Sequence, residues 1–187
     1  MFGVDIDLIK KGNPEYALRS KGKIAELALG YQGGKGSLIS MGALNMGLAE
    51  EELPDIVRRW RGSNKRIVGF WKAVEQYALD TVRHGVTGYM PCGIAFDRDG
   101  DYLSIILPSK RRLYYYKPEI RQNDLGRDAI HFRGVDQKTK KWGMISTYGG
   151  KLTENIVQAV ARDLLANSLM NLYRAGFVID FHIHDEV

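Results

Sequence analysis

Hydrophobic residues recur every three or four positions in the first half of the chain, which is the spacing of an amphipathic helix. Asn13-Pro14-Glu15 is typical of a helix start, with an N-cap residue, a proline at the first helical position and an acid in the first turn. We therefore predict a helix over about residues 14–32. Its apolar side is formed by residues that share one face of the helical wheel: Ala17, Leu18, Ile24, Ala25, Ala28 and Leu29. The same spacing predicts further helices at about 37–49, 54–60 and 64–84.

From about residue 86 the pattern changes to short runs of β-branched and aromatic residues separated by turns, which is typical of strands. Strands are predicted at 102–107, 113–116, 129–135 and 142–147, and an Asp-Gly turn is predicted before the first of them. A long helix is expected at about 151–175. The alternation from Phe177 to His184 predicts a final strand that carries His182 and His184 on one side. The chain is thus expected to be an α+β protein, mostly helical over residues 1–86 and β-rich with one long helix over residues 87–187.

The side of the first helix opposite its apolar face carries an unusual row of residues. Arg19, Lys23, Leu27 and Tyr31 follow one another at four-residue steps. An arginine fork and a lysine point charge suit a polyphosphate, and a tyrosine ring suits a base. An ordinary surface helix, with basic side chains lying over the core, explains this row equally well. The same helix contains two glycines, each less favourable there than alanine by about 0.8–1 kcal/mol, which indicates that something approaches it closely: Gly22 and Gly30.

Composition and charge narrow the possible partners. The net charge of +5 and the pI of about 9.2 favour a polyanion. A basic cluster lies between the predicted helices at 54–60 and 64–84, and a solvated face explains it better than a phosphate contact: Arg58, Arg59, Arg61, Lys65 and Arg66. The single cysteine, Cys92, excludes an internal disulfide, is expected to be buried, and fits a reducing compartment such as the cytoplasm. No run reaches the roughly 18 apolar residues of a membrane span, so no membrane partner is expected.

Two polar features occur in the second half of the chain. Asn155 and Gln158 lie beside cations on one row of the long helix, where they could contact the sugar edges and phosphates of a duplex. A plain polar helix face is the simpler interpretation of that row. Asp185-Glu186 is an acidic pair at the end of the predicted last strand, and such a pair suits a hard cation such as Mg²⁺.

Several of these motifs together resemble one protein family. Arg19-x3-Lys23-x7-Tyr31 is similar to the fingers-helix motif of family A DNA polymerases, the bacterial DNA polymerase I group, and His184-Asp185-Glu186 resembles the palm motif of that family. The sequences from Gly22 to Tyr31 and from Tyr148 to Asn155 are similar to phage members. The resemblance spans essentially the whole chain. It implies that residues 1–86 are a helical fingers-like region and that residues 87–187 are part of a palm.

The resemblance also implies roles for individual residues. Arg19 and Lys23 would hold the triphosphate of the incoming deoxynucleotide, Leu27 would flank its sugar and base, and Tyr31 would pack near the templating position. At the carboxyl end, Asp185 would bind the catalytic metals, two Mg²⁺ ions in the complete enzyme. The remaining implied roles are those of Glu186 as a nearby secondary carboxylate, of His184 near the primer terminus, and of Asn155 and Gln158 in contact with the primer–template. Lys23, Asp185 and Glu186 are the residues expected to act in catalysis, which is nucleotidyl transfer to a primer 3′ end.

The chain departs from the family pattern in ways that affect its activity. The second metal-binding aspartate of the family lies in a motif that Asp5 and Asp7 do not match, and the thumb is missing. We therefore expect a fingers-plus-palm fragment that is inactive alone. Its partners would be primed DNA, deoxynucleoside triphosphates and the rest of the polymerase, which supplies the aspartate motif, the thumb and a second hairpin strand. A non-catalytic nucleic-acid-binding remnant remains an alternative. A single-subunit RNA polymerase is less consistent with Glu186, because serine normally follows His-Asp in that group.

Overall fold

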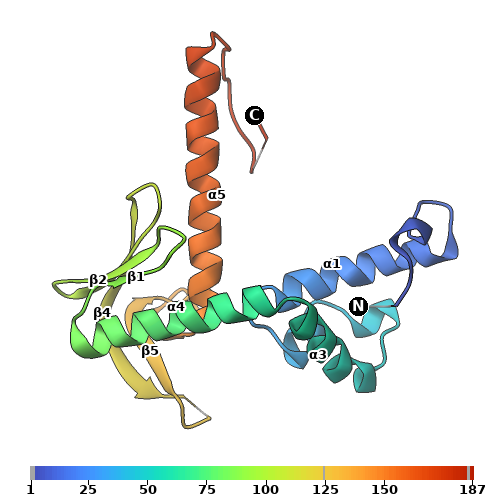
Figure 1. Ribbon diagram of the computed structural model, residues 1–187, viewed down its shortest axis with the longest axis horizontal. Coiled ribbons are helices and arrows are strands. Elements are labelled where there is room, and N and C mark those ends of the chain that lie inside the picture. Colours follow the sequence, from blue (N-terminus) through green and yellow to red (C-terminus); the bar gives the residue numbers. More distant parts are fainter. Residues whose placement is uncertain (1–2, 124, 185) are drawn as a thin grey trace. The chain divides into compact units, whose positions relative to one another are not determined.

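The computed structural model describes residues 3–123, 125–184 and 186–187, which form helices and one antiparallel sheet (Figure 1). This confirms the α+β class. The chain forms two compact units: one contains the residues up to Glu75 together with Gly149–Thr153, and the other contains Gln76–Tyr148 and Glu154–Val187. The first transition between the units lies inside a helix, whereas the sequence predicts a boundary at residue 86. The assignment of fingers and palm to these regions stays a prediction.

The first unit is built from short helical segments. In chain order they are η1 (Ile6–Leu8), η2 (Pro14–Tyr16), α1 (Ala17–Leu29), α2 (Lys35–Ser40), η3 (Leu44–Met46), η4 (Glu50–Glu52), α3 (Leu53–Ser63) and the first part of α4 (Lys65–His84). The four predicted helices are therefore present, but the segment 37–49 is divided into α2 and η3 by Gly42, whose φ of 87° does not continue a helix. Asn13 precedes the first turn as expected, although its side chain donates to the Leu8 carbonyl and forms no N-cap hydrogen bond.

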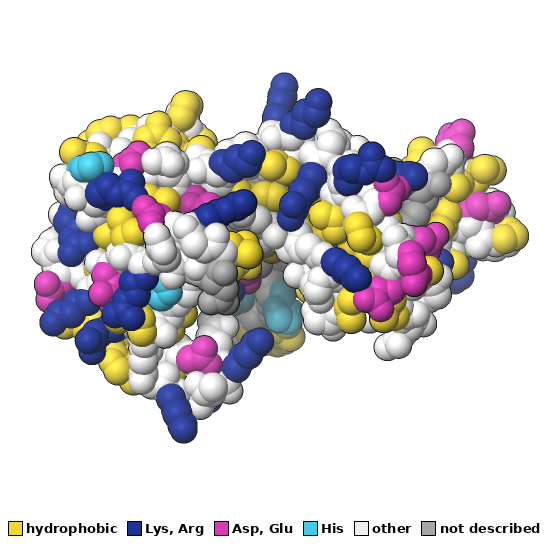
Figure 2. All heavy atoms as spheres, turned by 90° about the horizontal axis from the view of Figure 1, so that it is seen from below, with side chains coloured by type: hydrophobic (Ala, Val, Ile, Leu, Met, Phe, Trp, Pro, Cys, Tyr) yellow, Lys and Arg dark blue, Asp and Glu magenta, His cyan; other side chains and the backbone are white. Residues whose placement is uncertain are grey.

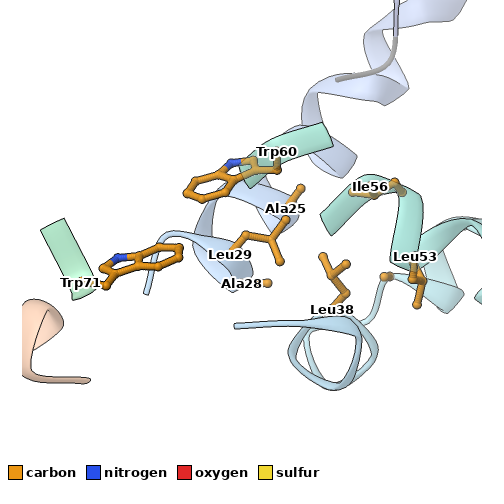
Figure 3. Close-up of a cluster of buried hydrophobic side chains, with 9 residues drawn as sticks. Ala25, Ala28, Leu29, Leu38, Leu53, Ile56, Trp60 and Trp71 are labelled. Atoms are coloured by element: carbon orange, nitrogen blue, oxygen red, sulfur yellow. The ribbon is translucent and has the colours of Figure 1, made fainter. Parts of the chain in front are cut away.

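The core of this unit lies between α1, α2, α3 and the beginning of α4 (Figure 3). Ala25, Ala28 and Leu29 come from the predicted apolar side of α1 and are buried. Trp60 and Trp71 lie with their rings nearly parallel and their centroids 5.9 Å apart. Burial of such large side chains contributes about 25 cal/mol per Å² of apolar surface, so this cluster is the main source of stability for α1.

The second unit contains a six-stranded antiparallel sheet in which every strand pairs with the next one in sequence (Figure 1). The strands are β1 (Gly88–Tyr89), β2 (Ala95–Asp99), β3 (Tyr102–Ile106), β4 (Arg112–Gln122), β5 (Asp128–Val135) and β6 (Trp142–Thr147). The four strands predicted between residues 102 and 147 are confirmed as β3 to β6, and β4 is longer than expected; β1 and β2 were not predicted. The Asp99-Gly100 turn between β2 and β3 is confirmed as well, with Gly100 at a φ of 56°. Cys92 lies after β1 and is exposed, so the expectation that it is buried was wrong.

One face of the sheet is covered by helices of the same unit. Phe96 of β2 stacks on Tyr77 of α4, with ring centroids 5.9 Å apart. Tyr115 of β4 lies on the same face and accepts a hydrogen bond from Asn155 of α5 (Gly149–Arg174), the predicted long helix. The alternation of side chains along each strand leaves the other face of the sheet outside this core.

The predicted last strand, Phe177 to His184, is not formed. Among the described residues of this region, Ile183 and Glu186 exchange two backbone hydrogen bonds, and the Phe177 N–H donates to the Leu172 carbonyl at the end of α5. A strand requires a neighbour that accepts and donates its backbone hydrogen bonds, and no described segment pairs with residues 177–182. The expectation that His182 and His184 share one side of a strand was therefore wrong.

Candidate nucleotide-binding helix and nucleic-acid contacts

The row predicted on the first helix is present on α1. Arg19, Lys23 and Leu27 are exposed, and Leu27 exposes 52% of its surface, which is unusual for a leucine whose neighbours Ala28 and Leu29 are buried. Tyr31 lies just beyond the helix and is half-buried. Because the intervening Gly30 keeps helical φ and ψ, the four-residue step is continued up to Tyr31.

The two cations of the row are not paired with carboxylates of the described residues. Lys35, by contrast, lies 2.9 Å from Glu50, and Arg59 lies 2.5 Å from Asp55. No such partner exists for Arg19 or Lys23 in the described ranges. Their positive charges are therefore available to an anion that comes from outside this part of the chain. On the face shown in Figure 2, lysine and arginine side chains lie among exposed hydrophobic and acidic side chains.

The carboxyl end of α1 is held in place by hydrogen bonds that sequence reasoning missed. The Trp71 indole Nε1 donates to the Gly30 carbonyl at 3.0 Å, and the Gly150 backbone N–H donates to the Gln32 side-chain oxygen at 2.7 Å. Arg61 donates to the Gly33 carbonyl at 3.1 Å. These contacts satisfy carbonyl groups at the helix end and so fix the position of Tyr31. The glycine pair at 149–150 was a possible signal, because two adjacent glycines at a helix start often allow a close backbone approach.

The glycines in and around α1 differ in the space that is available for a side chain. A Cβ at Gly150 would lie 2.3 Å from the Tyr31 carbonyl oxygen, and a Cβ at Gly30 would lie 2.9 Å from the Glu26 carbonyl oxygen. At Gly22 no atom of the described residues lies within 4 Å of the corresponding position. The close approach expected at Gly22 is therefore not made by a described residue.

Most of the basic cluster at 58–66 is occupied by local interactions. Arg58 and Arg59 both bind Asp55, and the Arg58 hydrogen bond is the first of the causes that lower the pKa of that carboxyl from its usual value. Arg61 binds the loop after α1 as described above. These contacts agree with a solvated helix face, which the sequence favours over a phosphate site.

The predicted primer–template residues lie on α5. Asn155 is half-buried, and its Nδ2 donates to the Tyr115 hydroxyl oxygen at 2.9 Å. Burial raises the pKa of Tyr115, and the hydrogen bond with Asn155 offsets part of this effect. Gln158 is three residues further along α5 and is exposed. Asn155 thus has one amide hydrogen bond inside the protein, while Gln158 faces solvent.

The carboxyl-terminal residues form a tight turn. Ile183 and Glu186 exchange two backbone hydrogen bonds of 3.0 Å, and His184 between them has a φ of 55°. Glu186 and His184 are exposed. The predicted metal ligand Asp185 lies outside the described residues. No group of three or more His, Cys, Asp or Glu side chains in the described part of the chain is placed to hold a metal ion.

All 187 residues of the chain align with a segment of one curated protein, and 51% of them are identical. That protein is named DNA polymerase and comes from Bacillus phage SP02. The chain is similar to a phage DNA polymerase. It spans 28% of that relative's length. No protein-family profile matches the sequence, and no solved structure matches it. No helix of the described residues is long and apolar enough to cross a membrane.

Proposed function

We propose that this chain is part of a template-dependent DNA polymerase and that α1 binds the incoming deoxynucleotide. The observation that carries the proposal is the 51% identity, over all 187 residues, with a protein named DNA polymerase. The unpaired cations of α1 support the specific role of this helix. In the proposed enzyme the chain belongs to the family A polymerases, with α1 in the fingers and α5 in the palm.

Arg19 and Lys23 are proposed to bind neighbouring phosphates of the triphosphate. They lie four residues apart, which is about 6 Å along the helix axis at 1.5 Å per residue. Arginine can offer two parallel N–H groups to one phosphate, and lysine adds a point charge on a long flexible stem. Since both side chains are exposed and neither has a carboxylate partner among the described residues, binding a polyanion breaks no ion pair there.

Leu27 and Tyr31 are proposed to contact the sugar, the base and the templating position. The exposed side of Leu27 offers an apolar surface one turn beyond Lys23. Tyr31 lies between two residues that are hydrogen-bonded at the anchored end of α1, so its backbone has little freedom to lose on binding. Gln158, the free oxygen of the Asn155 amide, and His184 are proposed to contact the primer–template.

Two Mg²⁺ ions are part of the proposal for the complete enzyme, with Asp185 as a ligand and Glu186 nearby. Carboxylate oxygens are the donors that Mg²⁺ prefers. The described residues, however, supply only Glu186 at this turn and no three-residue ligand cluster, so they do not by themselves make a magnesium site. The other carboxylates are proposed to come from the rest of the polymerase. The contribution supported for this chain is binding and orientation of the nucleotide, which lowers the entropic cost of the reaction.

The test is primer extension by a polymerase that contains this chain together with the flanking segments found in the phage relative. Lys23→Ala is expected to raise the KM for deoxynucleotides by about tenfold or more, since a charge-assisted hydrogen bond contributes about 1.5–3 kcal/mol. Its Kd for primed DNA is expected to stay unchanged. Lys21→Ala is the matched control, because Lys21 lies on α1 away from the row and this substitution removes an equal charge.

Three results would contradict the proposal in different ways. Equal losses in nucleotide use and DNA binding for Lys23→Ala would remove the assigned role of α1. A reconstituted protein that binds primed DNA and never extends it would support a nucleic-acid-binding remnant. Incorporation of ribonucleotides in preference to deoxynucleotides would support an RNA polymerase.

A further inference from the structure

The face of the sheet opposite the helices carries a group of aromatic side chains. Four rings from three strands belong to it: Tyr102, Tyr114, Tyr116 and Trp142. Tyr102 is exposed to 39%, Tyr114 to 54% and Trp142 to 61%. Large aromatic side chains on a sheet usually pack against another layer, and the described residues of this unit supply none on this face. We call these four residues the aromatic row.

Strand register places the aromatic row on one face. Tyr102 of β3 is paired with Tyr116 of β4, and Tyr116 is paired with Arg133 of β5. Arg133 in turn is paired with Met144 of β6, two residues after Trp142. Paired residues in an antiparallel sheet point to the same side, as do residues two apart on a strand. Tyr114 is therefore on this side too, while the buried Tyr115 points to the opposite one.

The rings contact one another in sequence. The ring centroids of Tyr114 and Tyr102 lie 5.5 Å apart, those of Tyr102 and Tyr116 lie 5.2 Å apart, and those of Tyr116 and Trp142 lie 6.5 Å apart. Tyr116 already has the Lys117 ammonium 5.5 Å from its ring centroid. Tyr114 and Trp142, at the two ends of the row, are therefore the rings best placed to stack with an external group.

Free cations lie beside the aromatic row. Lys117 and Arg133 have no carboxylate within salt-bridge distance in the described ranges, and the turn before Trp142 adds Lys140 and Lys141. The two carboxylates of β2 on this face share one cation, which offsets about half of their charge. The Arg112 guanidinium lies 3.3 Å from the Asp97 carboxylate and 4.0 Å from the Asp99 carboxylate. Around Lys117 and Arg133 the unpaired charge is thus positive, which complements a phosphate backbone, whereas carboxylates lie at the Tyr114 end of the row.

A hollow of about 490 Å³ lies at the Tyr114 end of the row. It is lined by Asp99, Gly100, Asp101, Tyr102 and Tyr114. This volume is within the range of small-molecule sites and is sufficient for a nucleobase. Two aromatic rings provide stacking surface, and the carboxylates can accept hydrogen bonds from N–H groups of a base.

We propose that this face of the sheet binds single-stranded DNA, with bases on Tyr114 and Trp142 and phosphates at Lys117 and Arg133. Stacked aromatics combined with cations are typical of sequence-tolerant single-strand binding. A protein partner would suit the aromatic rings and Arg133 but is less consistent with the unpaired lysines, because protein interfaces are depleted of lysine at their centre. The physiological strand, the unpaired template ahead of the primer, rests on the proposed polymerase function. The binding itself does not depend on that function.

The experiment measures binding of a fluorescein-labelled 12-nucleotide oligo-dT to the 187-residue chain by anisotropy. The double variant Tyr114→Ala/Trp142→Ala is expected to bind about 10- to 100-fold more weakly, from the loss of two stacking rings. Tyr173→Ala is the matched control, since Tyr173 is an equally exposed aromatic residue on α5, at 70%. Trp142→Phe keeps a ring and is expected to retain most of the affinity, which separates stacking from a folding defect.

Two further readouts locate the bound strand. Trp60 and Trp71 are buried, so quenching of tryptophan fluorescence on DNA addition reports on Trp142. The negative slope of log affinity against log salt is expected to become shallower by about 0.7 for each of the substitutions Lys117→Ala and Arg133→Ala. An oligo-U strand tests whether the same face accepts RNA equally well, in which case the proposal of a DNA site is overturned in favour of a general single-strand site.

The proposal is overturned if the double variant binds like the wild type, if Tyr173→Ala loses as much affinity, or if Trp142 fluorescence is not quenched. It is also overturned if Trp142 is inaccessible to iodide in the longer polymerase without DNA, because the face would then be a contact with another part of the protein. These outcomes leave the polymerase proposal intact when primer extension is normal. Loss of extension with unchanged oligo-dT binding would contradict only the polymerase proposal.

Discussion

Two glycines of the first unit show how the same residue type is used for opposite reasons. Gly150 is required by space, because a Cβ would meet the backbone of Tyr31. Gly22 is not required by any described residue, and it lies in α1, where glycine is less favourable than alanine. An unfavourable residue without a structural reason, one residue before Lys23, is expected at a place where a ligand approaches the helix.

This contrast predicts opposite effects of two equal substitutions. Gly150→Ala is expected to lower the free energy of unfolding by about 1–3 kcal/mol, because the added methyl group overlaps backbone atoms. Gly22→Ala is expected to raise it by about 0.5–1 kcal/mol. Urea denaturation of the chain measures both. In the complete polymerase Gly22→Ala is expected to raise the KM for nucleotides despite the gain in stability, and an unchanged KM would mean that no ligand approaches there.

Among the larger elements, α5 is joined to the sheet by side chains as well as by burial. Asp163 of α5 accepts hydrogen bonds from Ser109 at 2.5 Å and from the Arg111 Nε at 2.7 Å, both in the turn between β3 and β4. Arg111 also donates to the Ala159 carbonyl of α5 at 2.8 Å. The Ser109 hydrogen bond, followed by that of Arg111, lowers the pKa of the Asp163 carboxyl from its usual value. These contacts hold the exposed middle of α5 against the hairpin.

The lowered pKa of Asp163 makes this contact pH-dependent. A carboxyl whose pKa is lower in the folded than in the unfolded state stabilises the fold above the unfolded value, near 3.8, and loses that effect as the pH falls through the folded value. Asp163→Asn is expected to lower the stability at pH 6–7 and to have little effect once both states are protonated. Thermal unfolding at a series of pH values measures the difference. Asp101→Asn removes a carboxyl without these partners, and an identical pH profile for it would refute this account.

For the whole molecule, the distribution of exposed apolar residues is uneven. The segment after α5 exposes large side chains: Phe177 at 62%, Val178 at 88%, Phe181 at 70%, Ile183 at 58% and Val187 at 58%. These residues line a hollow of about 490 Å³ with the end of α5. Contiguous apolar surface of this kind promotes association with other protein surfaces.

The 187-residue chain alone is therefore expected to self-associate at rising concentration. The double variant Phe177→Ser/Phe181→Ser is expected to stay monomeric over a wider concentration range in sedimentation experiments, with a melting temperature close to that of the wild type. Leu125→Ser is the control, because Leu125 is equally exposed, at 76%, in the turn between β4 and β5. An effect of the same size for the control would assign the association to general hydrophobicity.

Local sequence determined the elements of this protein and the composition of the row on α1. The period of apolar residues, the glycine turns and the runs of β-branched and aromatic residues act over a few neighbours. The main helices and the strands β3 to β6 were therefore predicted apart from their exact ends, whereas the short strands β1 and β2 were not. The same locality explains the exposed positions of Arg19, Lys23 and Leu27. The function proposed for these residues came from the resemblance of the motifs to a DNA polymerase family. The 51% sequence identity with a phage protein named DNA polymerase supports the polymerase assignment and does not test the family.

Tertiary structure decided what depends on residues distant in sequence. Trp71 and Gly150 anchor the end of α1 from 41 and 118 positions away, which no local pattern contains. The segment 177–182 has the alternation of a strand but is not one, because strand formation requires a paired neighbour. The aromatic row is also a product of register: Tyr102 and Trp142 are distant along the chain from the tyrosines of β4, and strand pairing brings them to the same face.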